Sequence, residues 1–326
     1  MKNLLQLSKL TFLLFVGFSI QSCSDDDDDV TTPTGPSNIV EIALDTPDLS
    51  NLVAALSVAD GNLVDVLSGG EFTVLAPTNE AFETFLAANG FMSLSEVPTD
   101  VLSNILLNHV ISGTINSTNL VDAGSGYSTT NASNMDGDNL SLYFDTSSGV
   151  TFNGISSVVA ADIVASNGIV HVVDEVIGLP TVVTFAVSNP ALSTLVAALT
   201  TEGLSVDIVS ILSSSDEPSP FTVFAPTNDA FGSLLAELEL NALGDIPVDI
   251  LEATLGTHVA PEANVRSTDL VDGMSVNTIS STITVSLSDG AKLIDPNGRE
   301  SNIVAVDIQA YNGVVHVIDN VLLPQL

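Results

Sequence analysis

The histidines are the side chains in this sequence best suited to acid–base catalysis or metal binding, and there are four of them. They form two pairs, His109 with His171 in the first half and His258 with His316 in the second. Each lies inside an apolar run, as His171 does between Ile169 and Val173. A neutral, hydrogen-bonded histidine in the protein interior fits such runs better than a metal ligand or a general base. We therefore predict structural roles for His171 and His316, and no catalytic or metal-binding residues.

The lone cysteine, Cys23, follows a segment typical of export signals. Lys2 and Lys9 precede and flank a mostly apolar stretch that ends at Ile20 and is too short to cross a bilayer. The small residue Ser22 before a single cysteine resembles a bacterial lipobox, in which the cysteine is lipidated. An ordinary secretory signal with a chance cysteine is the alternative. We predict a signal peptide over residues 1–22, lipidation at Cys23, and no disulfide within the chain.

An acidic run follows the cysteine directly and belongs to a predicted tether over residues 23–37, which is also rich in proline and threonine. After a lipobox cysteine, such a run resembles the surface-export signal of Bacteroidetes lipoproteins. We therefore predict an outer-membrane protein, held by its lipid and facing the cell exterior. The residues of the predicted export signal are Ser24, Asp25, Asp26, Asp27 and Asp28.

The composition combines high negative charge with high hydrophobicity. The 326 residues include 5 Lys and Arg against 40 Asp and Glu, a formal net charge of −35, yet 45% are hydrophobic. Disorder requires low hydrophobicity, so the chain should fold. The scarcity of cations excludes nucleic acid as a partner and leaves the lipid as the only membrane contact. We predict no cofactor, and only weak, non-specific association of Ca²⁺ with the acidic surface. The Asp136–Asn139 segment resembles a calcium loop only faintly, and a surface turn is the better interpretation.

Most of the chain consists of two copies of one domain sequence. The block Phe72–Phe82 recurs as Phe221–Phe231, and the block Asn167–Asp174 recurs as Asn312–Asp319. Blocks repeated once in the same order, far apart in the sequence, indicate a tandem duplication rather than a solenoid. We predict two domains, over residues 38–180 and 181–326.

Each copy begins with helical patterns and continues with strand patterns. Apolar residues at helical spacing predict a helix around residues 49–56, and a short buried strand follows at 72–76. A second helix is predicted from Thr99 to near His109. Short strands and tight turns follow from Ile111 onward. Helices first and strands later indicate an α+β fold with a mostly antiparallel sheet. The repeated Thr-Asn pair after the buried strand should cap the next helix, which gives structural roles to Thr78, Asn79, Thr227 and Asn228.

The two repeated blocks resemble the hallmarks of the fasciclin, or FAS1, family: Thr-Val-x-Ala-Pro-Thr-Asn-x-Ala-Phe and Asn-Gly-x-Val-His-Val-x-Asp. The resemblance covers nearly all of residues 38–326. It implies a wedge of mostly antiparallel β-strands with a cluster of helices in each domain. It also implies a secreted or surface-anchored protein of cell adhesion, without enzymatic activity.

Two adhesion motifs of the family have partial counterparts here. The Asp-Ile pair before the second block is present in both copies, but the Glu-Pro that precedes it in animal proteins is absent. A family Tyr-His pair keeps its histidine, whereas Asn108 and Thr257 stand at the tyrosine positions. The resemblance therefore implies these candidate interaction residues: Asp162, Ile163, Asp307, Ile308, His109 and His258.

The favoured function is a lipid-anchored surface protein whose two FAS1 domains bind a protein or glycan at the cell surface. One alternative is a glycan-binding accessory subunit of an outer-membrane uptake system; the absence of Trp argues against a sugar platform, although Tyr127, Tyr143 and Tyr311 remain. The other is a hydrolase, for which the sequence offers neither a Gly-x-Ser-x-Gly elbow nor a suitable cysteine.

Overall fold

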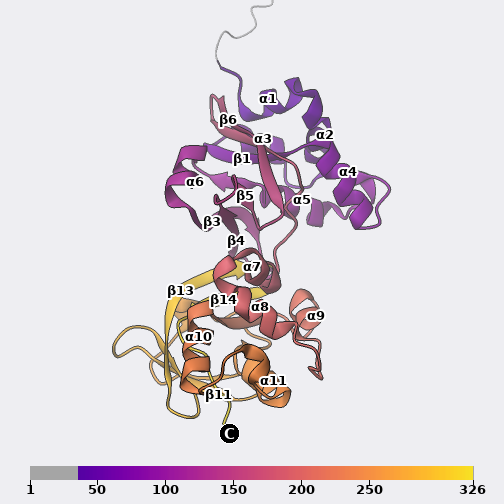
Figure 1. Cartoon of the computed structure of the whole chain (residues 1–326). Helices are drawn as coiled ribbons and strands as arrows, with labels where there is room; N and C mark the ends of the chain where they lie inside the picture. The colour runs from indigo at the N-terminus through magenta and orange to yellow at the C-terminus, as the bar shows by residue number, and fades with distance from the viewer. Residues whose placement is uncertain (1–35, 326) are drawn as a thin grey trace, which may run out of the picture. The chain divides into compact units, whose positions relative to one another are not determined.

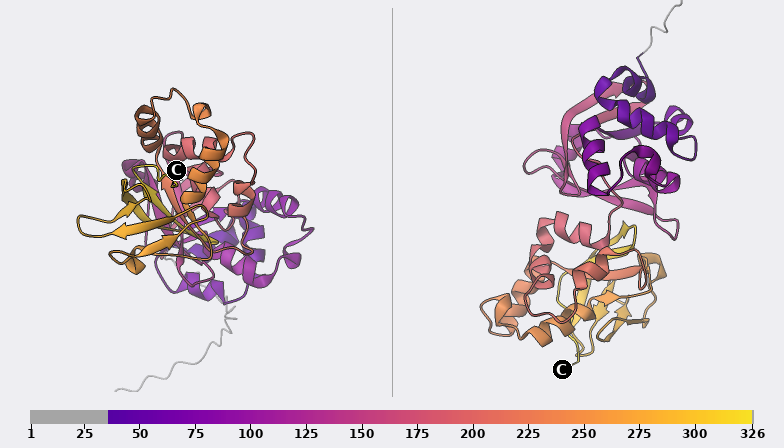
Figure 2. Two further views of the ribbon diagram at one scale, coloured as in Figure 1. Left: turned by 90° about the horizontal axis from the view of Figure 1, so that it is seen from below. Right: turned by 90° about the vertical axis from the view of Figure 1, so that its right-hand side faces the viewer.

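The computed structural model describes residues 36–325. The predicted signal peptide, the lipidation site Cys23, and the export signal Ser24–Asp28 lie outside the described residues. One compact unit begins at Pro36 and contains both sequence repeats. Helices precede most strands in each repeat, and in the right-hand view of Figure 2 most helices of each repeat lie on one side of its strands. The predicted α+β class is confirmed.

The first repeat contains six α-helices and seven strands among the described residues (Figure 1). The helices are α1 (Ile39–Asp45), α2 (Ser50–Val58), α3 (Leu63–Ser68), α4 (Asn79–Ala88), α5 (Thr99–Leu107) and α6 (Ser117–Ala123). The strands are β1 (Phe72–Pro77), β2 (Val110–Ser112), β3 (Ser125–Ser133), β4 (Asn139–Asp145), β5 (Thr151–Phe152), β6 (Ser156–Ala165) and β7 (Gly168–Val173).

The second repeat follows the same order with shorter strands in its middle. Its helices are α7 (Val182–Ser188), α8 (Ser193–Leu199), α9 (Ile208–Ser213), α10 (Asn228–Glu237) and α11 (Val248–Thr257). Its strands are β8 (Phe221–Pro226), β9 (Val259–Ala260), β10 (Ser275–Asn277), β11 (Thr282–Ser286), β12 (Lys292–Ile294), β13 (Glu300–Ala310) and β14 (Gly313–Ile318).

The two repeated sequence blocks form neighbouring parallel strands. Strand β1 pairs in parallel with β7, with Leu75 opposite His171. In the second repeat β8 pairs in parallel with β14, with Phe224 opposite His316. The other strand pairs in the described sheets are antiparallel, as the sequence predicts. The first sheet closes into a barrel, whereas the second has the strand order β10-β11-β12-β13-β14-β8-β9.

The Thr-Asn pair after the buried strand fixes the start of the next helix. Thr78 is the N-cap of α4, and its side-chain oxygen accepts the Ala81 amide proton. Asn79 reaches further, because its amide group accepts from the Asn51 N–H and donates to the Pro47 carbonyl. Thr227 and Asn228 make the equivalent bonds in the second repeat.

Helix α6 lies where the sequence predicts strands and turns. Residues 117–123 lie in a stretch rich in serine and threonine, yet they form α6. Asn116 starts it through a capping box, in which Asn116 and Asn119 each bond the other's backbone amide. The corresponding segment of the second repeat, Ser267–Asp269, forms only a single 3₁₀ turn.

Several polar contacts tie the repeats together within the compact unit. Arg266 forms an ion pair with Asp138, at 2.6 Å. The Asn134 amide donates to the buried Gln309 side chain at 3.1 Å. The predicted turn at Asp136–Asn139 is present, and its carboxylates bind the second repeat.

Gly168 opens β7 at the point of closest approach to β1, and we predict that Gly168→Ala strongly destabilises the protein. Its φ is +150°, and an added Cβ would overlap the backbone carbonyl of Phe72. The free energy of unfolding should fall by about 3 kcal/mol or more. Gly90→Ala is the matched control, because Gly90 also has a positive φ, +75°, but no atom within 4 Å of the added Cβ. It should cost only about 1 kcal/mol. Equal losses in denaturant melts would refute the close-approach argument.

Candidate functional site

Each domain has one long strand interrupted by an aspartate with left-handed backbone. Asp162 in β6 has φ 59°, and Asp307 in β13 has φ 57°. The ladder to the neighbouring strand shifts register at both points, between Ala160 and Ile163 and between Ala305 and Ile308. These are β-bulges, which bend a strand and turn its side chains. The Asp-Ile pairs of the sequence therefore lie at matching bulges.

A buried histidine and a serine hold each bulge. The Asp162 carboxylate accepts the Ser117 amide proton at 2.8 Å and the Ser117 hydroxyl proton. Behind it, the Asp162 amide donates to His171 Nδ1 at 3.2 Å. Hydrogen bonds from the Ser117 side chain and then its backbone lower the pKa of Asp162, so this carboxylate stays ionised. Asp307, Ser267 and His316 repeat the arrangement in the second domain.

The tautomer of these two histidines follows from their partners. His171 Nε2 lies 2.9 Å from the Ile115 carbonyl, and His316 Nε2 lies 2.8 Å from the Val265 carbonyl. A carbonyl oxygen only accepts, so Nε2 carries the proton and Nδ1 receives the aspartate amide. Both ring nitrogens are thus occupied by backbone groups. The site has a histidine, a serine and an aspartate, but the imidazole does not face the hydroxyl as a general base would.

His109 and His258 use the opposite tautomer. His109 Nδ1 donates to the Ile105 carbonyl at 2.8 Å, and Nε2 accepts the Ile177 amide proton at 2.9 Å. His258 makes the same two bonds, to Thr254 and Leu322. Burial lowers the pKa of each from 6.5 to about 4, and the backbone hydrogen bond opposes this only in part. Both rings are therefore neutral at physiological pH.

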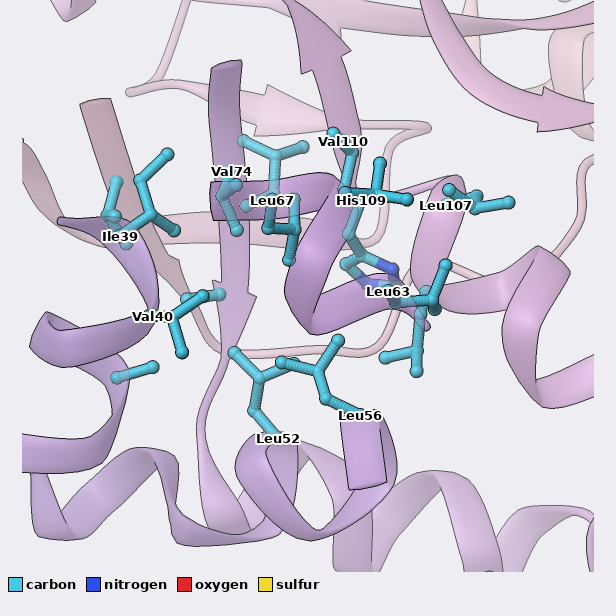
Figure 3. Close-up of a pocket in the computed structure, with 16 residues that line it drawn as sticks. Ile39, Val40, Leu52, Leu56, Leu63, Leu67, Val74, Leu107, His109 and Val110 are labelled. Carbon is cyan, nitrogen blue, oxygen red and sulfur yellow. The ribbon is translucent and has the colours of Figure 1, made fainter. Parts of the chain in front are cut away.

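A small apolar cavity adjoins each of these histidines. Figure 3 shows His109 beside aliphatic side chains from several elements, among them Leu52, Leu63 and Val74. The cavity has a volume of about 20 Å³, and its counterpart beside His258 has the same volume. Space on that scale holds about one water molecule, and the lining offers it few polar partners. These cavities are packing defects of the core, too small for an organic ligand.

The outer surfaces of the bulged strands are exposed and mostly apolar. On β6, Val159 is 58% and Val164 is 73% exposed. On β13, Val304 is 57% and Val306 is 45% exposed. We call these surfaces the outer-strand faces. Each surrounds the bulge aspartate, so it offers aliphatic side chains beside a fixed carboxylate.

The candidate interaction residues fall into exposed and buried groups. Asp162 is exposed, and Ile163 and Asp307 are half-buried. Ile308 is only 3% exposed, and His109 and His258 are 1% and 3% exposed. A partner can reach the first group without any rearrangement, but not the second. The candidate interaction site therefore narrows to the aspartates, Ile163 and the exposed valines around them.

The asparagine of the second sequence block has a role that the sequence did not reveal. The Asn167 side chain accepts from the Ile39 amide and donates to the Leu67 carbonyl, at 2.9 and 2.6 Å. It thereby joins α1, α3 and the β6–β7 turn. In the second repeat, the Asn312 side chain likewise accepts from the Val182 amide and donates to the Leu212 carbonyl.

Two of the three tyrosines are engaged where the domains meet. The Tyr127 ring packs on Phe185 edge to face, with centroids 5.7 Å apart, and its hydroxyl accepts from Asn189. Tyr143 lies 5.1 Å from the Tyr127 ring and is only 3% exposed. Neither ring offers a free face for a sugar, which weakens the glycan alternative.

Within residues 36–325, no group of three or more His, Cys, Asp or Glu side chains is arranged to hold a metal ion. Over the same residues, no single helix is long and apolar enough to cross a membrane. Two consecutive helical segments, Val182–Ser188 and Pro190–Leu199, are long and apolar enough only when taken together, and the chain bends by 99° between them.

Sequence comparison decides the family. The family model of the fasciclin domain matches residues 47–180 and again 190–324. The chain belongs to the fasciclin family. The fold agrees: a FAS1 domain pair from the insect cell adhesion molecule Fasciclin I matches with a TM-score of 0.51 and 21% identity, over 85% of this chain and 97% of that one. The tandem FAS1 fold predicted from the sequence is thus confirmed.

Relatives of this fasciclin protein occur in bacteria and mammals. Protein sll1483 of Synechocystis is 38% identical over 146 residues, which cover 45% of this chain and 74% of that protein. Transforming growth factor-beta-induced protein ig-h3 of Sus scrofa is 29% identical over 257 residues, 78% of this chain but only 35% of ig-h3. Cell surface glycolipoprotein MPB83 of Mycobacterium bovis is 45% identical over 94 residues, 25% of this chain and 41% of MPB83. The family and the fold are those of adhesion and cell-surface proteins.

The buried histidines predict a loss of stability on mild acidification. His109 and His258 have a folded pKa of about 4, below the unfolded value of 6.5. Their contribution to the free energy of unfolding is therefore complete above pH 6.5 and is lost as the pH falls from 6.5 toward 4. The free energy of unfolding should decrease by roughly 2 kcal/mol between pH 6.5 and 5.5 for the two together.

Imidazole ¹⁵N chemical shifts would test the assignment directly. His109 and His258 should report a neutral ring protonated at Nδ1 down to pH 5, whereas His171 should report protonation at Nε2 at neutral pH. His171 and His316, one in each domain, have the opposite tautomer and serve as the internal control. A charged ring at His109 or His258 at pH 6 would refute the structural assignment.

Proposed function

We propose that this fasciclin protein is a lipid-anchored adhesion protein of the outer cell surface. The observation that carries the proposal is the match of the fasciclin domain to both halves of the chain. Relatives are named as a cell surface glycolipoprotein and, for the matched structure, a cell adhesion molecule. We further propose that the chain has no enzymatic activity, since its histidines are held by backbone groups rather than directed at a nucleophile.

The anchor in this proposal is the lipid on Cys23, and the tether is residues 23–37. The acidic run Ser24–Asp28 would direct the lipoprotein to the outer face of the outer membrane, as its resemblance to the Bacteroidetes signal implies. The first described helix, α1, begins at Ile39, only a short distance beyond this tether. In this proposal the acidic tether holds the domains off the membrane surface.

The outer-strand faces are the proposed contact surfaces. Both domains expose valines around a bulge aspartate, so one chain offers two related surfaces. Partners of this surface would be proteins at or outside the cell envelope, because Tyr127 and Tyr143 are engaged at the junction and unavailable to a sugar ring. Two linked weak sites gain overall affinity through effective concentration.

The localisation proposal predicts two separable defects. Cys23→Ala should release the protein from the membrane fraction, because no lipid can be attached. Replacing Asp25 to Asp28 with Asn should keep the protein in the membrane fraction but protect it from protease added to intact cells. Fractionation and protease shaving measure the two effects. Membrane retention of Cys23→Ala would overturn the anchor, and continued cleavage of the Asn variant would overturn the export signal.

The adhesion proposal predicts that the β6 surface is needed for attachment. Beads coated with the lipid-free chain should bind the producing cells, and Val159→Ser with Val164→Ser should reduce attachment several-fold at unchanged free energy of unfolding. The control pair is Val121→Ser with Val187→Ser, because those valines are 58% and 64% exposed but lie outside the outer-strand faces. Equal attachment by both double variants would contradict the proposal.

A further inference from the structure

A groove in the second domain is large enough for a ligand. It measures about 590 Å³ and lies between α9, α11 and the turn that joins β10 to β11. Small-molecule sites usually occupy about 300–1,000 Å³ and combine an apolar lining with a few polar groups. The apolar part of this groove comes from Val206, Ile208, Ile211, Leu212, Val248 and Ile279. The aligned face of α5 in the first domain, at Asp100, Ser103, Asn104 and Leu107, lines a smaller pocket of about 340 Å³.

One difference in lining between the repeats is a glycine on α11. Gly256 on α11 occupies the position that Leu107 holds on α5, in the aligned blocks that end at His258 and His109. Because Gly256 has no side chain, the 279–280 turn lies directly on the helix, and an added Cβ would overlap the Ser280 hydroxyl. In the first domain, Leu107 lies beside α3 residues and lines the small cavity of about 20 Å³. The two domains therefore differ in shape at this position.

The polar groups of the groove carry negative charge. Glu252 and Asp249 line it from α11, and the lining contains no Lys or Arg. Glu252 is held in place, because its two carboxylate oxygens accept the Ser205 amide and hydroxyl protons at 2.7 and 2.5 Å. The first domain has Ser103 at the Glu252 position. Glu252 accepts hydrogen bonds, whereas Ser103 donates one, to the backbone carbonyl of Asp60.

The cations of the described chain are all engaged elsewhere. Arg266 pairs with Asp138 and Asp269, Lys292 pairs with Asp289 and Glu300, and Arg299 pairs with Glu237 and Asp295. Among residues 36–325, no cationic side chain therefore neutralises the groove. An anionic ligand would meet two carboxylates there, whereas a cation would gain from both.

We propose that this groove binds a small amphiphilic cation: an aliphatic chain that carries one primary ammonium group. The chain would cover the valine and isoleucine side chains, including Ile279, which is 54% exposed. The ammonium would lie at Glu252 and Asp249. This site is separate from the outer-strand faces and does not depend on the adhesion proposal.

The test uses three probes with the same chain and different head charge: n-octylammonium, 1-octanol and octanoate. Each is titrated into the ¹⁵N-labelled lipid-free chain, the two ions below their micelle concentrations and octanol below its solubility limit, and backbone amide shifts are followed. Octylammonium should shift Gly203, Gly256 and Ile279 in a saturable manner, bind more tightly than octanol, and leave Leu107 unmoved. Octanoate should bind most weakly. Equal affinities for the three probes, or shifts spread evenly over both domains, would overturn the proposal.

Variants separate the contribution of the groove's charge to binding from the contribution of its apolar lining. Glu252→Gln keeps an acceptor for Ser205 but removes the charge, and it should weaken octylammonium binding up to about fivefold while leaving octanol unchanged. Asp65→Asn, on α3 of the first domain, is the matched control and should have no effect. Ile279→Ser should weaken octylammonium and octanol alike. Unchanged octylammonium affinity in a folded Glu252→Gln variant would refute the role of the carboxylate.

Discussion

The parallel pairing of β1 with β7, and of β8 with β14, is the constraint on which the rest of each domain depends. The paired segments are separated by most of the domain in sequence, yet they lie side by side in register. Closing that loop costs chain entropy, which the buried contacts along both strands must repay. Gly168 and Gly313 permit the approach, since both have φ of +150° and leave no room for a Cβ. The two hallmark blocks of the family are thus the two sides of one contact.

This pairing explains why the distinctive residues of the sequence are mostly internal. His171 stands opposite Leu75, and its ring bonds to the backbone of the neighbouring bulge and loop. Asn167 joins two helices to the end of the same strand pair. Residues that look suited to chemistry therefore hold the fold. The surfaces proposed for functional contacts are the outer-strand faces, which both domains have, and the groove of the second domain.

Local signals in the sequence predicted much of the fold, while long-range contacts were harder to foresee. The cap at Thr78 could be predicted because its partner, Ala81, lies three residues away. Helix α6 is also locally capped, but its serine and threonine content favours strand and turn interpretations. The role of Asn167 depends on Leu67, 100 residues earlier, and no spacing rule connects them. The groove is lined by Gly256, where the first domain has Leu107, and by a turn that packs against the helix, so it is recognised only in the folded structure.

Native-state hydrogen exchange tests the central claim most directly. If the parallel pair is the constraint that holds each domain together, amides that bond across it should exchange only through global unfolding, with the slowest rates in the first domain. Examples are the amides of Phe72, bonded to Asn167, and Thr78, bonded to Val173. The same should hold in the second domain for the amides of Phe221, bonded to Asn312, and Thr227, bonded to Ile318. The amides of α4 and α10 should exchange faster, through local opening. Exchange of the β1 and β7 amides at the rates of those helices would contradict the account.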